Sequence, residues 1–187
     1  MKRLAFLTVL LAVLFAGCSK APSAFDVSGR LLYNTTVDTP LVGYSVTIST
    51  DPYGISPTLY LAITDANGFY QFTGIPEGTY YLYAETHDEW VGVAPNDVTH
   101  LQRYIAILSN DLTGNPLRIK SADSNLDGLI NQTDAEILKL KIAHLAAPGW
   151  ALPDWLFENP QITVTGNTYV VLKGMCAGDF NGSYLTQ

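Results

Sequence analysis

The stretch from Asp123 to Asp134, DSNLDGLINQTD, decides the fold of the second half of the chain. Counted from Asp123, side chains with carboxylate or amide oxygens stand at positions 1, 3, 5 and 12 (Asp123, Asn125, Asp127 and Asp134), and Gly128 stands at position 6. A calcium ion takes six to eight oxygen ligands at about 2.3–2.6 Å, so the chain has to wrap around the ion, and a glycine permits the sharp turn that this requires. The spacing therefore predicts a calcium-binding loop that leads into a helix. The alternative is a hydrophilic turn with a helix N-cap at Asp134.

The remaining positions of this loop fit the same interpretation. We expect the carbonyl of Leu129, at position 7, to supply a backbone ligand, Asn131 to act through water, and Ile130 to point into a core. The pattern resembles the EF-hand loop, with Asp in place of the usual Glu at position 12. The sequence thus predicts one bound Ca2+ ion. Its expected ligands are Asp123, Asn125, Asp127, Leu129 and Asp134.

An internal repeat extends the pattern. Apolar residues at helical spacing follow Asp134, and the same spacing occurs 37 residues earlier, where Asp97 takes the place of Asp134. The two apolar sets are Val98, Leu101, Ile105 and Leu108, then Ala135, Leu138, Ile142 and Leu145. Two loop–helix units in tandem, over residues 92–145, resemble dockerin modules, and this resemblance implies calcium binding and a cohesin-like protein partner. The exposed helix residues that would contact such a partner are Thr99, Gln102, Arg103, Glu136 and Lys139.

The first repeat lacks the opening half of its loop, because Trp90 and Val91 stand where a carboxylate and a glycine are required. The C-terminal stretch from residue 178 to residue 184, GDFNGSY, resembles that missing opening. We therefore hypothesise a second calcium site, split between two segments of the chain. The groups expected there are Asp179, Asn181, Ser183, the carbonyl of Gly92, and Asp97. An exposed Asx turn in the tail is an equally good interpretation.

The first half of the chain carries the alternation of β-strands. Residues 25–33 are expected to form a first strand, and residues 42–49 and 59–63 alternate between apolar and polar side chains. Turns are expected at Asn67-Gly68, a typical hairpin pair, and at residues 74–78. Short strands at this spacing predict a small antiparallel β-sandwich. The run from residue 64 to residue 83 resembles the B-type, carboxypeptidase-regulatory-like sandwich modules, which are usually spacers or stalks. The many tyrosines favour either core packing or stacking on sugars.

A third β-hairpin is expected between the helical repeats and the tail. Residues 161–165 and 168–173 alternate around Gly166-Asn167, and the aromatic side chains of Trp150, Trp155 and Phe157 are expected to cover the helical pair. This order resembles the C-terminal dockerin-like regions of large secreted proteins from Bacteroidetes-type bacteria. The predicted fold is therefore α+β and multi-domain. It combines a small antiparallel β-sandwich with a paired EF-hand-like helical module and a C-terminal hairpin.

The N-terminus indicates export. Lys2 and Arg3 precede an apolar run from residue 4 to residue 15, which is too short to span a bilayer and reads as a signal peptide. The small residues before Cys18 resemble the lipobox of bacterial lipoproteins, with Phe15 where Leu is usual. This resemblance implies lipidation at Cys18 and localisation to the cell envelope, on the outer membrane. An ordinary secretory signal with an incidental cysteine is the alternative.

Composition excludes several classes of function. The net charge is −7 and the chain has no Lys/Arg run, so nucleic acid is not an expected partner. The three histidines lie far apart in the sequence and no catalytic motif is present, so we expect no enzyme. Cys176, among apolar neighbours, is expected to be a buried, inert thiol.

The predicted function is that of a calcium-dependent scaffold or protein-interaction lipoprotein. Its partner would be a cohesin-like protein or another protein of the envelope. The alternatives are a carbohydrate-binding accessory lipoprotein of a polysaccharide-utilisation system, and a stalk whose calcium is purely structural. The expected domains are a signal peptide (1–17), a lipidated tether (18–24), a β-sandwich (25–86), dockerin-like repeats (87–147), and an aromatic segment with hairpin and C-terminal clasp (148–187).

Overall fold

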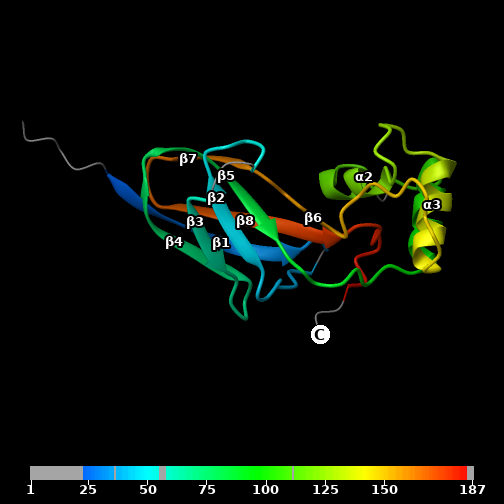
Figure 1. Ribbon diagram of the computed structural model, residues 1–187, viewed down its shortest axis with the longest axis horizontal. Helices are drawn as coiled ribbons and strands as arrows, with labels where there is room; N and C mark the ends of the chain where they lie inside the picture. The colour runs from blue at the N-terminus through cyan, green and yellow to red at the C-terminus, as the bar shows by residue number, and fades with distance from the viewer. Residues whose placement is uncertain (1–22, 36, 55–57, 111, 185–187) are drawn as a thin grey trace, which may run out of the picture.

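Two four-stranded sheets and three helices make up the part of the chain that the structure describes, with the helices inserted between the fifth and sixth strands (Figure 1). The structure is a computed structural model and describes residues 23–35, 37–54, 58–110 and 112–184. The predicted α+β fold, a β-sandwich joined to a helical region, is confirmed. The signal peptide, Cys18 and most of the tether lie outside the described residues.

The sandwich is built from strands of both ends of the chain. One sheet has the order β4 (Phe69–Pro76), β1 (Ala24–Tyr33), β8 (Thr168–Cys176) and β6 (Trp155–Phe157). The other has the order β3 (Tyr60–Ile63), β2 (Ser45–Ser49), β5 (Gly78–Glu85) and β7 (Gln161–Val164). The C-terminal strands therefore complete the two sheets that the N-terminal strands begin.

The tight turns connect the two sheets, so the expected hairpins are wrong in their pairing. β3 and β4, β4 and β5, and β7 and β8 are each consecutive in sequence, yet the members of each pair lie in different sheets. β8 instead pairs with β1 in parallel, with Val27 opposite Thr168, and β7 pairs with β5. Two strands joined by a turn can pair in one sheet or face each other across the core from two sheets. Alternation cannot distinguish these arrangements, because each strand carries one apolar face in both of them.

The core of the sandwich uses the inward faces of these strands. Val46 and Ile48 of β2 are fully buried, whereas the alternating side chains at positions 59, 61 and 63 point outward and are about half exposed. Tyr33, Tyr44, Tyr70 and Tyr80 are all buried, so the core interpretation is confirmed for these four tyrosines.

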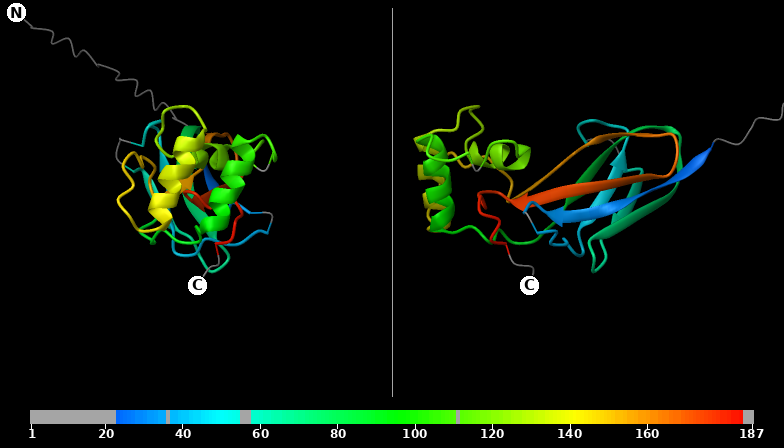
Figure 2. Two further views of the ribbon diagram at one scale, coloured as in Figure 1. Left: turned by 90° about the vertical axis from the view of Figure 1, so that its right-hand side faces the viewer. Right: turned by 180° about the vertical axis from the view of Figure 1, so that it is seen from behind.

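The helical region contains α1 (Pro95–Ile105), α2 (Pro116–Ala122) and α3 (Gln132–Ile142). α1 and α3 lie side by side and repeat at the predicted offset of 37 residues (Figure 2). They pack through a second apolar core that includes Leu101, Leu138 and Phe180. The last apolar residue of each set, Leu108 or Leu145, lies beyond the end of its helix and is exposed. Among the described residues no helix is long and apolar enough to cross a bilayer.

Two tryptophans join the cores, since Trp90 and Trp150 pack against both of them. The Lys141 Nζ of α3 lies 5.0 Å from the Trp90 ring centre and 4.8 Å from that of Trp150, and 2.7 Å from an Asp154 carboxylate oxygen. Contacts of a cation with two aromatic faces and a carboxylate tie α3 to the end of the sandwich. Trp155 and Phe157, expected to cover the helices, belong instead to the sandwich core and its margin.

Candidate metal centre

The loop between α2 and α3 places the predicted calcium ligands on a framework of backbone hydrogen bonds. Asp123 caps the C-terminus of α2, and its carboxylate accepts the amides of Asp127 (3.0 Å) and Gly128 (2.9 Å). The Asp127 carboxylate accepts the amide of Leu129 at 2.8 Å. Gly128 has φ of +85°, in the left-handed region that favours glycine, as predicted for the sharp turn.

Asp134 closes the loop from the first turn of α3. It is fully buried, and its two carboxylate oxygens accept the amides of Ser124 (2.8 Å) and Asn131 (2.9 Å). Asn131 is the N-cap of α3 and forms a capping box with Asp134. The helix therefore begins where an ion would be held. The Asp134 side chain fixes both the two ends of the loop and the orientation of α3.

These hydrogen bonds orient the carboxylates without using all of their acceptor capacity. An ionised carboxylate has about four lone-pair sites, and the bonds to Asp123 and Asp134 occupy two sites each. Within the described residues no three His, Cys, Asp or Glu side chains gather as a metal cluster, so the structure does not bring the three predicted carboxylates, Asp123, Asp127 and Asp134, together as one such group. A bound ion would therefore also need the amide oxygen of Asn125 and the carbonyl of Leu129. Such a mixed set of oxygen donors suits a hard cation such as calcium.

The residues of the hypothesised split site are brought together from the start of α1 and from the C-terminal tail that follows β8. The Oγ of Ser183 donates to the carbonyl of Gly92 at 2.7 Å, and the Asp97 carboxylate accepts the amide of Asn181 at 3.1 Å. Asp179 is buried beside them. Figure 1 shows this tail, drawn in red, between the tip of β8 and the helices. The tail is thus packed against the first repeat, and its ligation of an ion remains a prediction.

Burial governs the electrostatics of this second region. Asp97 is fully buried at the start of α1 and accepts the amide of the helix N-cap, Ala94, as Asp134 accepts that of Asn131, although Ala94 has no side-chain oxygen to cap the helix in return. Burial, together with the nearby charge of Asp179, raises the pKa of Asp97 above its ordinary value, although three backbone amides act in the opposite direction. A cation beside these carboxylates would offset that cost.

Several structurally important neighbours were not predicted from the sequence. Tyr33, at the end of β1, donates its hydroxyl proton to Asp179 at 2.6 Å and accepts the amide of Cys176 at 3.1 Å. The Oγ of Ser121 in α2 accepts the amide of Gly178 at 2.6 Å. α2 was also missed, although Asn115 followed by Pro116 is a typical helix start and does cap it.

The residues expected to contact a partner lie on the outer sides of α1 and α3. Thr99 and Arg103 are exposed on α1, and Gln102 is partly buried. Glu136 and Lys139 are exposed on α3 and pair with each other at 2.7 Å. Hydrogen bonds from Lys139 and Gln132 lower the pKa of the Glu136 carboxyl. Four of the five side chains are therefore exposed to solvent on the two helices.

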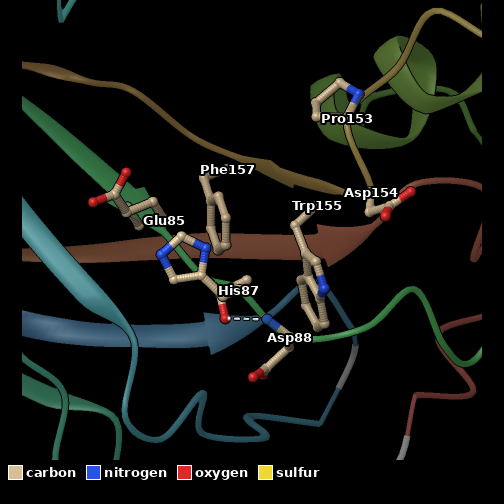
Figure 3. A pocket seen from close by; sticks show the side chains of 9 residues that line it. Glu85, His87, Asp88, Pro153, Asp154, Trp155 and Phe157 are labelled. Atoms are coloured by element: carbon tan, nitrogen blue, oxygen red, sulfur yellow. Dashed lines mark hydrogen bonds between the residues drawn. The ribbon is translucent and has the colours of Figure 1, made fainter.

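A separate hollow of about 380 Å3 lies where the end of β5 meets β6 (Figure 3). The rings of Trp155 and Phe157 stack in its wall with centroids 6.2 Å apart, and Glu85 lies beside them. Trp155 is only 7% exposed, so it offers little ring face to a sugar. The Asp154 carboxylate is already held by Lys141. This hollow therefore gives little support to sugar binding.

Comparison with known proteins bears directly on the helical region. Residues 92–143 match the dockerin type I domain family. The match includes the loop from Asp123 to Asp134 and both repeated helices, so the predicted resemblance of these repeats to dockerin is confirmed. The dockerin match ends before β6, β7, β8 and the tail at residues 178–184.

Solved structures resemble the chain at low identity. A DUF3823 family protein from Parabacteroides merdae is 12% identical, with a TM-score of 0.38, over 84% of this chain and 48% of that protein. BcpA, the major pilin subunit of Bacillus cereus, is 8% identical, with a TM-score of 0.41, over 83% of this chain and 31% of the pilin. The chain thus spans less than half the length of either protein. No curated protein sequence matches the chain.

Proposed function

We propose that the dockerin region binds a cohesin-like protein partner in a calcium-dependent manner, and that the β-sandwich holds this region away from a membrane to which Cys18 is lipid-anchored. One observation carries the proposal. The loop from Asp123 to Asp134 lies within the dockerin match, and its carboxylates are held by backbone amides at the start of α3.

Calcium would act on recognition by fixing the two helices relative to each other. Asp134 joins the N-terminus of α3 to Ser124 after α2, and the buried faces of α1 and α3 share one apolar core. An ion bound by the loop lowers the freedom of α3, and the outer residues of both helices then form one rigid surface. Preorganisation of this kind raises affinity because less conformational entropy is lost on binding.

The surface on α1 and α3 is the proposed partner contact, with Arg103 and Lys139 as its basic side chains. Lys120, on α2, is exposed and lies outside this set, so it provides a control of equal charge. The sandwich is proposed to be a spacer, since four of its tyrosines are buried in the core. We propose no catalytic role for either part.

Binding to a panel of immobilised cohesin modules, measured in calcium and in EDTA, tests the proposal. We expect a complex in calcium that EDTA dissolves. Asp123→Asn and Arg103→Glu should weaken it at least tenfold, a change of about 1.4 kcal/mol, and Lys120→Glu should not. Equal binding in calcium and EDTA would contradict calcium-dependent docking, and loss of binding only with Lys120→Glu would contradict the proposed surface. Failure of Cys18→Ser to abolish incorporation of labelled fatty acid would contradict the anchor.

A further inference from the structure

The tail at residues 179–184 repeats the hydrogen-bond pattern of the opening half of the dockerin loop. Asp123 accepts the amides four and five residues later, from Asp127 and Gly128. Asp179 likewise accepts the amides four and five residues later, from Ser183 (3.0 Å) and Tyr184 (3.1 Å), and in addition the amide of Gly182 (2.8 Å). The tail therefore repeats the hydrogen bonds from positions 5 and 6 to position 1 of the loop, although Tyr184 stands at position 6 in place of glycine and the tail lies outside the dockerin match.

The closing half of the pattern is supplied by the start of α1. In the loop, Asp134 accepts the amide of the residue after Asp123 and the amide of its own helix N-cap. Asp97 accepts the amide of Phe180 (2.8 Å), the residue after Asp179, and the amide of Ala94 (2.9 Å), the N-cap of α1. The two halves are 82 residues apart in the chain, from Asp97 to Asp179, and meet as they do in the continuous loop.

The middle of the pattern also matches. Ser183 stands at position 5 of the tail, and Gly92, 37 residues before Leu129, stands at position 7. The Ser183 Oγ lies 2.7 Å from the Gly92 carbonyl oxygen, so two expected ligands are adjacent. Gly92 has φ of +78°, and a Cβ there would lie 3.1 Å from the Cα of Tyr184. The close approach of the two segments thus depends on this glycine.

One side chain at this junction lacks the partner that its burial demands. The amide oxygen and nitrogen of Asn181, at position 3, are both buried, and neither has a hydrogen-bond partner among the described residues. In the continuous loop the equivalent Asn125 bonds to Asp127 through both atoms. A buried amide without a partner costs about 1–3 kcal/mol. An oxygen-seeking cation beside Asp179 would satisfy the amide oxygen.

The charges at the junction point to the same ligand. Asp97 and Asp179 are 0% and 1% exposed, and no Lys or Arg of the described residues forms an ion pair with either. Four hydrogen bonds to Asp179 and three to Asp97 stabilise these carboxylates, but their two negative charges still repel each other and have lost hydration. The other oxygen atoms at the junction belong to the Asn181 amide, the Ser183 hydroxyl and the Gly92 carbonyl, which are ligand types that a hard divalent ion takes.

We propose that residues 179–183 and 92–97 together form a second calcium site, assembled from two distant segments. Asp179, Asn181 and Ser183 provide the opening ligands, and the Gly92 carbonyl and Asp97 provide the closing ones. The site also reaches the sandwich, because Tyr33 donates to Asp179 and its ring stacks on Tyr184 with centroids 4.5 Å apart. Calcium at this site joins the tail, α1 and the sandwich into one unit.

Calorimetric counting of calcium bound to the full chain tests the site. We expect two ions for the unmodified chain, one for Asp179→Asn, one for Asp123→Asn and none for the double variant. Asp65→Asn is the matched control, because Asp65 accepts two backbone amides in a sandwich turn (2.8 and 2.9 Å) away from both sites. It should leave two ions. A single ion that Asp123→Asn removes and Asp179→Asn leaves would overturn the split site while leaving the dockerin loop intact. A single ion that Asp179→Asn removes and Asp123→Asn leaves would overturn calcium binding by the dockerin loop.

A second variant tests the site without removing a buried group. Asn181→Asp adds a carboxylate at position 3, beside Asp97 and Asp179. With an ion present, the added ligand should tighten binding at this site at least threefold, and the melting temperature in calcium should not fall. In EDTA the third buried negative charge should lower the melting temperature. Lower melting temperatures in both conditions, with unchanged calcium affinity, would overturn the proposal.

Discussion

Tyr33→Phe is the perturbation that best isolates how the tail is attached to the sandwich. The substitution keeps the ring and its stacking on Tyr184, and it removes only a hydroxyl that is fully buried. That hydroxyl donates to the Asp179 carboxylate at 2.6 Å and accepts the Cys176 amide at 3.1 Å. Burial, followed by the charge of Asp179, raises the pKa of Tyr33, so the hydroxyl stays protonated and remains a donor at any ordinary pH.

The expected cost is set by the two groups that lose a partner. A hydrogen bond to a charged group contributes about 1.5–3 kcal/mol, and a buried amide left unpaired costs about 1–3 kcal/mol. Partial relaxation reduces the sum, and we expect a loss of about 2–4 kcal/mol in the free energy of unfolding. Tyr70→Phe is the matched control. Tyr70 is 1% exposed and its hydroxyl makes one neutral bond, to the Val170 carbonyl at 2.8 Å, so its loss should cost about 1 kcal/mol.

Urea unfolding followed by circular dichroism, in calcium, measures both variants. Tyr33→Phe should move the midpoint further than Tyr70→Phe, with similar slopes. Equal shifts, or a shift for Tyr33→Phe that corresponds to less than about 0.5 kcal/mol, would refute the reasoning that the Asp179 contact fastens the tail.

Three further outcomes follow from packing and burial. Leu138→Ala, in the fully buried centre of the helical core, should lower the unfolding free energy by about 2–5 kcal/mol in thermal melts, and a loss below about 1 kcal/mol would contradict the packing described. Gly178→Ala should lower the unfolding free energy by about 1–3 kcal/mol, because φ is +95° and the new Cβ would lie 2.8 Å from a Leu138 methyl. The double variant with Leu138→Ala should lose less than the sum of the two single losses. Strict additivity would argue against that contact. Burial raises the pKa of the Cys176 thiol to about 12. In a Cys18→Ser chain at mildly alkaline pH, a thiol reagent should therefore modify Cys176 only at the rate of unfolding. Fast labelling of the folded chain would be the contrary result.

The sequence was most informative where ligand chemistry requires particular residues at fixed spacing. The loop from Asp123 to Asp134 and the offset of 37 residues predicted both long helices and their buried faces, because calcium ligation and helical packing each impose a period. The meeting of Asp97 with the tail was also predicted, since a loop without its first half needs those ligands from elsewhere. The predicted helices were too long at their C-terminal ends, because Leu108 and Leu145 continue the apolar spacing but lie beyond α1 and α3.

The sandwich was less predictable in its connections than in its strands. The turns at Gly68 and Gly166 were recognised, yet each links two sheets, and alternation alone carries no information on which strand becomes the neighbour. The parallel pairing of β1 with β8 brings together residues 27 and 168, and no local sequence pattern predicts this contact. The role of Tyr33 was hidden for the same reason, because its partner Asp179 lies 146 residues away.

The most direct test of the central claim is hydrogen exchange of the full chain, measured by mass spectrometry in calcium and after chelation. If the ion at residues 123–134 holds the helical pair together, chelation should speed exchange in α1 and α3 and leave the core strands β1 and β2 protected as an internal reference. Unchanged protection of α3 after chelation would contradict the account.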